Sequence, residues 1–180
     1  MTAQTAFGFA DEMRVGLRGT VRRVWGRRGV KIRQAVQLKY QWRYLFLVVD
    51  GRAGTLVWCW IDSMAAEEIL AAVGGLQQTV ELGALVWDGA SSHRDADVQA
   101  LGLPLIGLPP RSPELNPAER VFEELRRAIE GKVYATLDDK VAAVEAELAK
   151  LEAEPAQVRS LAGWDWIEAA VPQPAASQAA

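Results

Sequence analysis

Short hydrophobic runs and helix-like spacings alternate along the chain, and together they predict a domain of mixed strands and helices. Apolar runs bounded by turn residues are typical of buried strands, whereas apolar residues three and four positions apart indicate an amphipathic helix. We expect, in order, strands at 6–10, 42–49 and 55–61, a helix at 64–78, a strand at 83–87, a short helix at 95–101, a strand at 103–108, and helices at 116–130 and 137–153. Antiparallel strands followed by α/β alternation predict the α/β class, with a mixed β-sheet flanked by α-helices.

Residues with special backbone preferences mark the ends of several of these elements. The stretch Asp50–Gly54 lies between two strands and is typical of a hairpin turn, because Asp-Gly readily adopts the positive φ values of a tight turn. Ser63 is a candidate N-cap for the first helix, and the Asn-Pro pair at 116–117 is expected to begin another. Thr136 and Asp139 match a capping pair at the start of the last predicted helix.

Composition sets the expected size of the domain and the class of protein. The chain has 180 residues, 50% of them hydrophobic, which is enough for one domain with its own core. We expect that domain to cover residues 1–171 and the Pro-, Ala-, Gln- and Ser-rich residues 172–180 to form a disordered tail. No apolar run is long enough to span a membrane, no signal peptide is visible, and Cys59 is the only cysteine. These features favour a cytoplasmic protein with no membrane partner.

Positive charge is concentrated in one part of a chain whose net charge is −3. Residues 13–49 contain no Asp or Glu but ten of the 20 Lys and Arg residues, and residues 13–33 are glycine-rich, which predicts a loop or a poorly formed strand. Such segregation fits a polyanion-binding face, although a solvated charged loop fits the charge pattern equally well. The DNA-binding candidates are Arg14, Arg18, Arg22, Arg23, Trp25, Arg27, Arg28, Lys31 and Arg33.

Three acidic residues stand where the predicted elements would bring them together. Asp11 and Asp88 each follow an apolar strand, and the carboxyl ends of neighbouring parallel strands meet at one edge of a sheet. Glu119 falls in the first turn of the helix expected from residue 116. Three converging carboxylates repel one another unless cations lie between them, and oxygen ligands select Mg²⁺ or Mn²⁺. We expect two ions about 4 Å apart, bridged by Asp11, with Asp88 completing one site and Glu119 the other.

Each of these acids also has an ordinary structural explanation. Asp11 could end a strand at a turn, and Asp88 with the following glycine could form a turn of its own. Glu119 stands three residues after Asn116 and could be a capping-box glutamate. The carboxylates by themselves leave these alternatives open.

The sequences around two of the acids resemble a known family. The stretch LPPRSPELNPAERVFEELR, at 108–126, closely resembles a signature of mariner-like transposases, and in particular of their bacterial branch, the insertion-sequence 630 family. The third catalytic carboxylate of that signature falls on Glu119. The stretch LVWDGASSH, at 85–93, is similar to the family's apolar strand followed by Asp-Asn-Ala-x-x-His, which places the catalytic aspartate at Asp88.

The resemblance extends to the N-terminal part of the chain. The stretch FADE, at 9–12, resembles the family's first Asp-Glu block and assigns Asp11, and RRVWGRRG, at 22–29, is similar to its Arg-x-x-Trp-x-x-x-Gly segment. The matching region covers roughly residues 7–135. Within it the chain departs from the family at three positions, with Gly89 for Asn, Arg111 for an aromatic residue and Phe122 for Trp.

The resemblance implies a ribonuclease H-like fold and a DDE endonuclease that cleaves and joins DNA strands at the ends of insertion elements. It implies double-stranded DNA as the partner, nucleoid association and, as in related enzymes, a possible homodimer. His93, Glu12 and Asn116 are then candidates for positions beside the catalytic carboxylates or the DNA, although His93 could equally pack locally. Trp25 and Trp42 could stack on unpaired bases or belong to the core.

The family normally carries helix-turn-helix domains before its first catalytic strand, and we expect these to be absent from this chain. An upstream polypeptide or reading frame would then recognise the element ends. The alternative is a truncated, non-autonomous remnant that keeps the fold and binds DNA without productive transposition. A ribonuclease H-like nuclease with a cellular role is a third possibility, which the proline-rich block disfavours.

Overall fold

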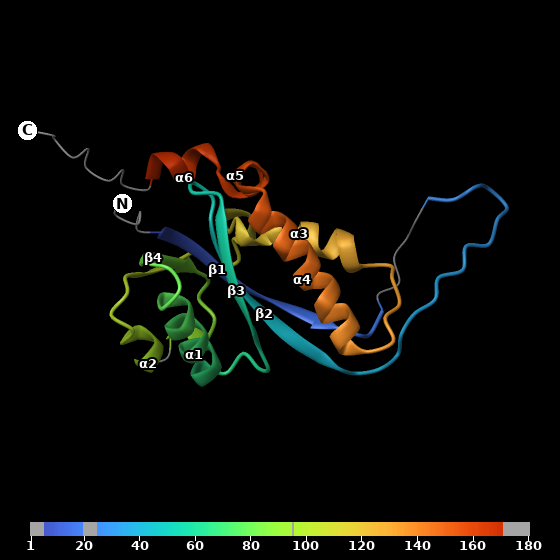
Figure 1. Ribbon diagram of the computed structural model, residues 1–180, viewed down its shortest axis with the longest axis horizontal. Helices are drawn as coiled ribbons and strands as arrows, with labels where there is room; N and C mark the ends of the chain where they lie inside the picture. The colour runs from blue at the N-terminus through green and yellow to red at the C-terminus, as the bar shows by residue number, and fades with distance from the viewer. Residues whose placement is uncertain (1–5, 20–24, 95, 171–180) are drawn as a thin grey trace, which may run out of the picture.

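The computed structural model describes residues 6–19, 25–94 and 96–170, and its described strands form one mixed sheet in the order β3-β2-β1-β4-β5 (Figure 1). β1 pairs antiparallel with β2 and parallel with β4, β2 pairs antiparallel with β3, and β4 pairs parallel with β5. The strands are β1 (Ala6–Gly16), β2 (Trp42–Asp50), β3 (Thr55–Ile61), β4 (Leu82–Trp87) and β5 (Leu105–Gly107). This arrangement confirms the predicted mixed sheet.

Helices cover both faces of the sheet. The helices α1 and α2 pack on one face, and the C-terminal helices pack on the other. The helices are α1 (Ala66–Gln77), α2 (Ala96–Gln99), α3 (Ala118–Ile129), α4 (Leu137–Ala153), α5 (Pro155–Ala162) and α6 (Asp165–Ala170). The prediction of two final helices therefore missed the short pair α5 and α6 that follows them.

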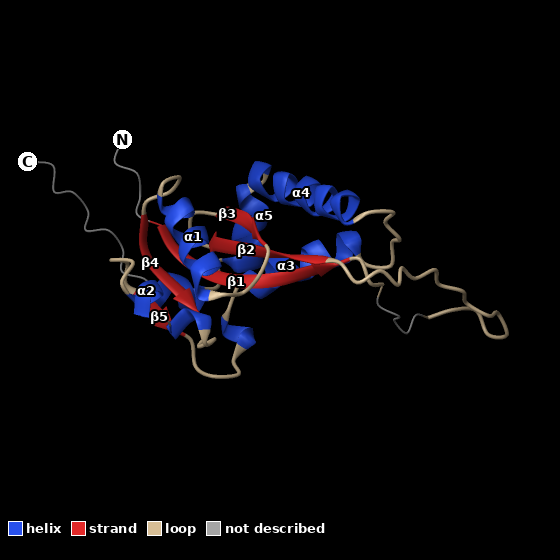
Figure 2. Ribbon diagram, turned by 90° about the horizontal axis from the view of Figure 1, so that it is seen from below, coloured by secondary structure: helices blue, strands red, loops and turns tan. Residues whose placement is uncertain are grey.

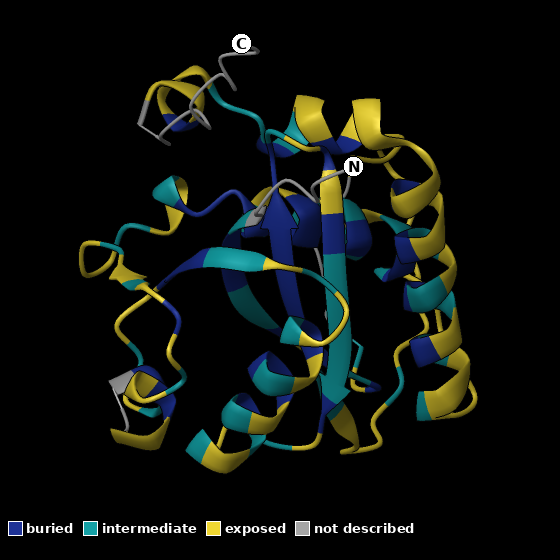
Figure 3. Ribbon diagram, turned by 60° about the vertical axis from the view of Figure 1, so that its left-hand side comes forward, coloured by how far each residue is buried: buried dark blue, intermediate teal, exposed yellow. Residues whose placement is uncertain are grey.

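Alternation along the central strands produces two separate hydrophobic cores. In β2, Leu45 and Leu47 pack with α3 and α4 on one side, whereas Phe46 and Val48 pack with α1 on the other. Because both faces are covered, β2 has a continuous apolar sequence rather than an alternating one. The central strands are accordingly buried and the outward faces of the helices are exposed (Figure 3).

β1 is longer than predicted, and this changes the position of Asp11. The strand does not end at residue 10 but continues to Gly16 and remains paired with β2 over that length. Its pairing with β4 stops earlier, at Phe9 opposite Val86. The expectation that Asp11 ends a strand is therefore wrong: the residue lies inside β1, level with the point where β4 ends.

Several local predictions need correction. The hairpin turn forms as expected, but among its glycines it is Gly54, with φ 72°, and not Gly51 that takes the positive φ. The N-cap of α1 is Ala65 rather than Ser63, whose hydroxyl instead accepts a hydrogen bond from the Ala65 backbone N–H at 3.3 Å.

β5 is a short edge strand with Ile106 44% exposed, so it is not a buried strand. The capping box of Thr136 and Asp139 is confirmed.

The basic segment forms an arm between β1 and β2 that extends away from the sheet (Figures 1 and 2). Backbone hydrogen bonds from Leu17 to Gln41 and from Gly19 to Gln37, both 2.9 Å, continue the β1–β2 ladder into the base of this arm. The arm is defined here as residues 17–41, of which 20–24 lie outside the described residues. Two predicted DNA-binding residues, Arg22 and Arg23, lie among residues 20–24, and the expected tail at 172–180 also lies outside the described residues. None of the described helices has the length and apolar character needed to cross a bilayer.

Candidate active site

Asp11, Asp88 and Glu119 line a single pocket of about 470 Å³ on the face of the sheet that α3 covers. The loop from Leu108 to Ser112, which joins β5 to the turn before α3, forms the opposite wall. The structure thus brings together three acids that are separated by up to 108 positions in sequence.

Asp11 is fixed by backbone and side-chain donors at the floor of this pocket. Its carboxylate accepts hydrogen bonds from the Glu12 backbone N–H at 2.8 Å and from the Asn116 amide at 3.1 Å. Burial raises the pKa of Asp11, and the negative charges of Glu12, Glu119 and Asp88 raise it further, to about 7, against the lowering effect of the hydrogen bond from Glu12. A carboxylate with so high a pKa is poorly stabilised by its own surroundings and would gain from a nearby cation.

Asp88 directly follows β4 and is held in place by two contacts. Its Oδ1 accepts a hydrogen bond from the Ala90 backbone N–H at 2.9 Å, which is the turn that the sequence alone allowed. The same oxygen also lies 2.9 Å from Nδ1 of His93. Asp88 is therefore oriented by a buried imidazole as well as by its own turn.

His93 connects Asp88 to Glu12 through the interior of the protein. Its Nε2 lies 3.0 Å from Oε1 of Glu12, and the imidazole and carboxylate side chains are only 2% and 3% exposed. The ring stacks on Trp87 with a centroid distance of 4.2 Å and an interplanar angle of 3°. Burial alone would lower the pKa of His93, but the hydrogen bonds and charges of Glu12 and Asp88 outweigh it and raise that pKa. His93 therefore both packs locally and contacts a candidate catalytic residue, so the two interpretations of the sequence are not exclusive.

Glu119 enters the pocket from the first turn of α3, where Asn116 organises the chain. The Asn116 side chain accepts a hydrogen bond from the Ala118 backbone N–H at 3.1 Å and donates to the Ala10 carbonyl at 3.0 Å, so it joins the helix start to β1. The Asn116 backbone N–H donates to the Pro113 carbonyl rather than to Glu119, which excludes a capping box. Glu119 instead forms an ion pair with Arg126, about two helical turns further along α3, at 3.2 Å.

The donor set of the pocket suits a hard divalent cation, although its side chains are not arranged around one. Among the described residues, no three His, Cys, Asp or Glu side chains lie close enough together to hold an ion. Glu119 lines the same pocket as Asp11 and Asp88, but its carboxylate is paired with Arg126. Carboxylate oxygens and the raised pKa of Asp11 make Mg²⁺ or Mn²⁺ the ions that fit this chemistry.

Sequence reasoning missed three features of this region. Arg126 is the last residue of the signature at 108–126, but the signature assigned it no role, and the structure shows that it pairs with Glu119. Arg111 stood out only as a departure from the family, but it lines the carboxylate pocket with a left-handed φ of 61°. Trp164 and Trp166 lie beyond the matching motifs and line an adjoining cavity.

Apart from buried Leu17 and half-buried Gly19 and Gln37, the described residues of the arm are exposed, and none of them lines the carboxylate pocket. Arg14 and Arg18 stack over Trp42 and Tyr40, each with a guanidinium carbon 4.9 Å from the ring centroid. Trp25 is fully exposed and Trp42 is 40% exposed, so neither belongs to the core. The remaining described candidates, Arg27, Arg28, Lys31 and Arg33, are also exposed.

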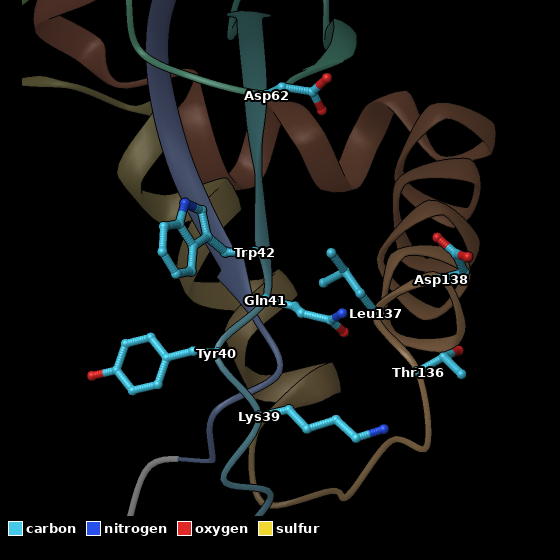
Figure 4. A pocket seen from close by; sticks show the side chains of 8 residues that line it. All are labelled: Lys39, Tyr40, Gln41, Trp42, Asp62, Thr136, Leu137 and Asp138. Atoms are coloured by element: carbon cyan, nitrogen blue, oxygen red, sulfur yellow. The ribbon is translucent and has the colours of Figure 1, made fainter.

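A further cavity, of about 730 Å³, lies where the arm returns to the sheet (Figure 4). Gln41 and Leu137 point toward each other there, whereas Tyr40 and Trp42 lie on the other side of the strand. This cavity shares no lining residue with the carboxylate pocket, and its two carboxylates, Asp62 and Asp138, come from separate elements. We therefore do not assign it a catalytic role.

Sequence comparisons relate the chain to known proteins. A family described as DDE superfamily endonuclease matches residues 7–140. The chain is 32% identical over 133 residues to the uncharacterized protein y4pE/y4sA of Sinorhizobium fredii (strain NBRC 101917 / NGR234), covering 69% of this chain and 96% of that protein.

Solved structures of the Mos1 transposase show the same fold. Its paired-end complex with the left transposon end matches with a TM-score of 0.57 and 14% identity over 86% of this chain and 54% of that chain. The mariner Mos1 paired-end complex with Mg matches with a TM-score of 0.56 and 12% identity over 88% and 56%. The chain thus spans about half the length of the Mos1 chains, and the fold is that of ribonuclease H-like transposase and integrase catalytic domains.

Proposed function

The chain belongs to the DDE superfamily endonuclease family, and from this premise we propose that it is the catalytic domain of an insertion-sequence 630 transposase, which cleaves DNA strands and joins them at element ends. The observation that carries the proposal is the convergence of Asp11, Asp88 and Glu119 on one pocket at the end of β4. The proline-rich block at 108–113, which carries the resemblance to the insertion-sequence family, forms a wall of the same pocket.

The same three carboxylates would hold the divalent cations of the reaction. When bound, such ions activate the attacking oxygen and neutralise charge on the leaving oxygen. The Mos1 complex with Mg supports this choice of ion. Within this chain, Asn116 holds the Asp11 carboxylate toward the pocket and His93 holds that of Asp88, while buried Glu12 fixes the imidazole from the opposite face of the sheet.

The arm is proposed to contact the DNA phosphates, since its exposed Arg and Lys residues belong to a segment that extends away from the sheet. The Mos1 structure is a complex with a transposon end, which supports double-stranded DNA as the partner. We further propose that residues 1–171 act as one catalytic unit in the cytoplasm, near the nucleoid, and that a separate polypeptide supplies recognition of the element ends, with a homodimer as the working assembly.

The proposal is tested by cleavage of end-labelled inverted-repeat DNA with Mg²⁺ or Mn²⁺. Asp88→Asn keeps the size of the side chain and removes its charge, and we expect it to lower the cleavage rate by at least about 100-fold. Asp138→Asn, an equivalent change on the exposed start of α4, serves as the matched control and is expected to cleave at the wild-type rate. Equal cleavage by wild type and Asp88→Asn would refute the assignment. DNA binding without metal-dependent cleavage by the wild type would instead support the non-autonomous remnant.

A further inference from the structure

A second cavity, of about 720 Å³, lies directly beside the carboxylate pocket. The two share Pro113, Asn116 and Glu119 as lining residues, so a DNA strand whose phosphate lies at the carboxylates has this cavity next to it. The cavity runs from the start of α3 to the two tryptophans around α6. A group that occupies this cavity would therefore be the part of a DNA strand next to the bound phosphate.

The far wall of the cavity is aromatic and is held rigidly by the core. Trp166 is 42% exposed and meets buried Phe9 edge-on, with ring centroids 6.1 Å apart and an interplanar angle of 90°. Trp164 lies beside it at 6.1 Å, and its indole N–H donates to the Leu161 carbonyl at 3.0 Å. Each ring is thus anchored on one side, which leaves little conformational entropy to be lost when a planar group stacks on the open side.

The cavity is lined by acidic residues, and this charge determines whether a phosphate or a base could enter it. Glu114, Glu119 and Glu123 line it, and the one basic side chain among the lining residues, Arg120, is paired with Glu123 at 2.9 Å. A phosphate would be repelled by these carboxylates. A neutral, planar base would not, and it matches the exposed indole face.

We propose that this cavity receives an unpaired nucleobase, stacked on Trp166, from the nucleotide next to the phosphate at the carboxylate pocket. The inference rests on the proposed DNA-cleaving function, because it is that function which places a strand at Glu119. The C-terminal helices would then hold the strand unpaired beside the reacting phosphate. Stacking on the indole would offset the free energy lost when the base pair opens.

Binding of single-stranded DNA in the absence of Mg²⁺ tests the cavity apart from cleavage. The probes are a fluorescein-labelled thymidine decamer and a decamer of abasic sites that carries the same charge, each followed by fluorescence anisotropy. We expect Trp166→Ala to weaken binding of the thymidine decamer by about tenfold and that of the abasic decamer by less than about twofold. Trp166→Phe, which keeps an aromatic face, should retain most of the affinity.

Trp58→Ala is the matched control, because Trp58 is a partly exposed tryptophan on β3 that donates to Glu152 at 2.9 Å and lines neither pocket. It should leave both affinities unchanged. Equal weakening of both decamers by Trp166→Ala, or no weakening of either, would overturn the proposal. This binding test needs no Mg²⁺ and is therefore independent of the cleavage test. Base-dependent binding, together with a wild type that does not cleave DNA, would refute the catalytic function but support the base-binding cavity.

Discussion

At the scale of single residues, the charged form of Asp11 is electrostatically unfavourable in the folded protein. Its carboxylate is largely buried and has three other acidic groups around it, while the Glu12 N–H and the Asn116 amide donate hydrogen bonds that stabilise its charge. Folding therefore brings together charges that the unfolded chain keeps apart in water. Such an arrangement lowers stability without a ligand and increases the gain when a cation binds.

We expect Asp11→Asn to stabilise the metal-free protein at pH 8. The pKa of Asp11 rises from 3.8 in the unfolded chain to about 7 in the fold, so the protonated group favours folding at low pH, and this contribution is lost as the pH rises through about 7. Removing the charge should raise the free energy of unfolding at pH 8 by about 1–3 kcal/mol and have little effect near pH 4. Urea denaturation in EDTA at both pH values measures the difference.

Added Mg²⁺ supplies the control for this prediction, because an ion that binds only the folded wild type should reduce or reverse the advantage of the Asn variant. Destabilisation by Asp11→Asn at pH 8 in EDTA would contradict the electrostatic account.

Arg111 is expected to be strained because its φ of 61° lies in the left-handed region, which costs a non-glycine residue about 1 kcal/mol. Arg111→Gly and Arg111→Ala both remove the guanidinium from the rim of the carboxylate pocket, but only glycine suits this backbone. The glycine variant should therefore be the more stable in thermal unfolding, and both should bind DNA less tightly than the wild type. Equal melting temperatures for the two variants would show that the strain is absent.

The sequence predicted the residues of the site better than it predicted their contacts. Motif and spacing named Asp11, Asp88 and Glu119, and the structure places all three in one pocket. Neither pattern could show that Arg126 pairs with Glu119, because a basic residue on an exposed helix face has many possible partners. Trp166 was missed for a related reason: its neighbour Phe9 is distant in sequence, and only packing brings the rings together.

At the scale of elements, the hairpin turn between β2 and β3 is joined to the end of α5 by direct backbone contact. A Cβ on Gly51 would lie 2.1 Å from the Ala162 carbonyl oxygen, and one on Gly163 would lie 2.6 Å from that of Gly51. Only glycine permits this approach, which fixes the start of α6 and hence the tryptophans of the second cavity.

Gly51→Ala should therefore destabilise the protein by about 2–4 kcal/mol, because backbone atoms cannot move aside as a flexible side chain would. Gly74→Ala in α1, where an added Cβ meets nothing within 4 Å, is the matched control and should stabilise the helix by about 0.5–1 kcal/mol. Chemical denaturation of both variants measures these changes. Similar stability of the Gly51 and Gly74 variants would mean that the turn and α5 are not in contact.

The ends of helices and strands could be predicted where a local sequence signal determines them, but not where pairing with another strand does. The capping box at Thr136 is encoded within four residues and was predicted correctly. The continuation of β1 to Gly16 was not, since Glu12, Arg14 and glycine are unusual in a strand and pairing with β2 overrides their preferences. This extension has a direct consequence for the site, because it places Asp11 inside a strand held on one side by β2.

At the scale of the whole molecule, opposite charges are separated in space. The net charge is −3, yet the exposed Arg and Lys residues of the arm belong to a segment that extends away from the sheet, whereas the C-terminal helices are rich in acidic residues. A uniform charge of −3 would repel DNA, whereas this separation fits the proposal that the arm approaches phosphates and the carboxylates bind cations. The net charge alone argues against DNA as a partner, whereas the distribution of Lys and Arg along the sequence fits a DNA-binding face as well as it fits a solvated charged loop.

The arm should therefore dominate the salt dependence of DNA binding. Replacing Arg27, Arg28 and Lys31 with alanine removes three exposed positive charges, and the slope of log affinity against log salt should fall by about 0.9 for each of these side chains that binds a phosphate. Replacing Arg127, Lys132 and Lys150, which are exposed on or beside the C-terminal helices, removes the same charge from the body and should leave the slope nearly unchanged. Anisotropy titrations of a labelled duplex between 50 and 200 mM KCl, a range of about fourfold in salt, measure both slopes. Equal slopes for the two triple variants would mean that net charge, and not the arm, governs the interaction with DNA.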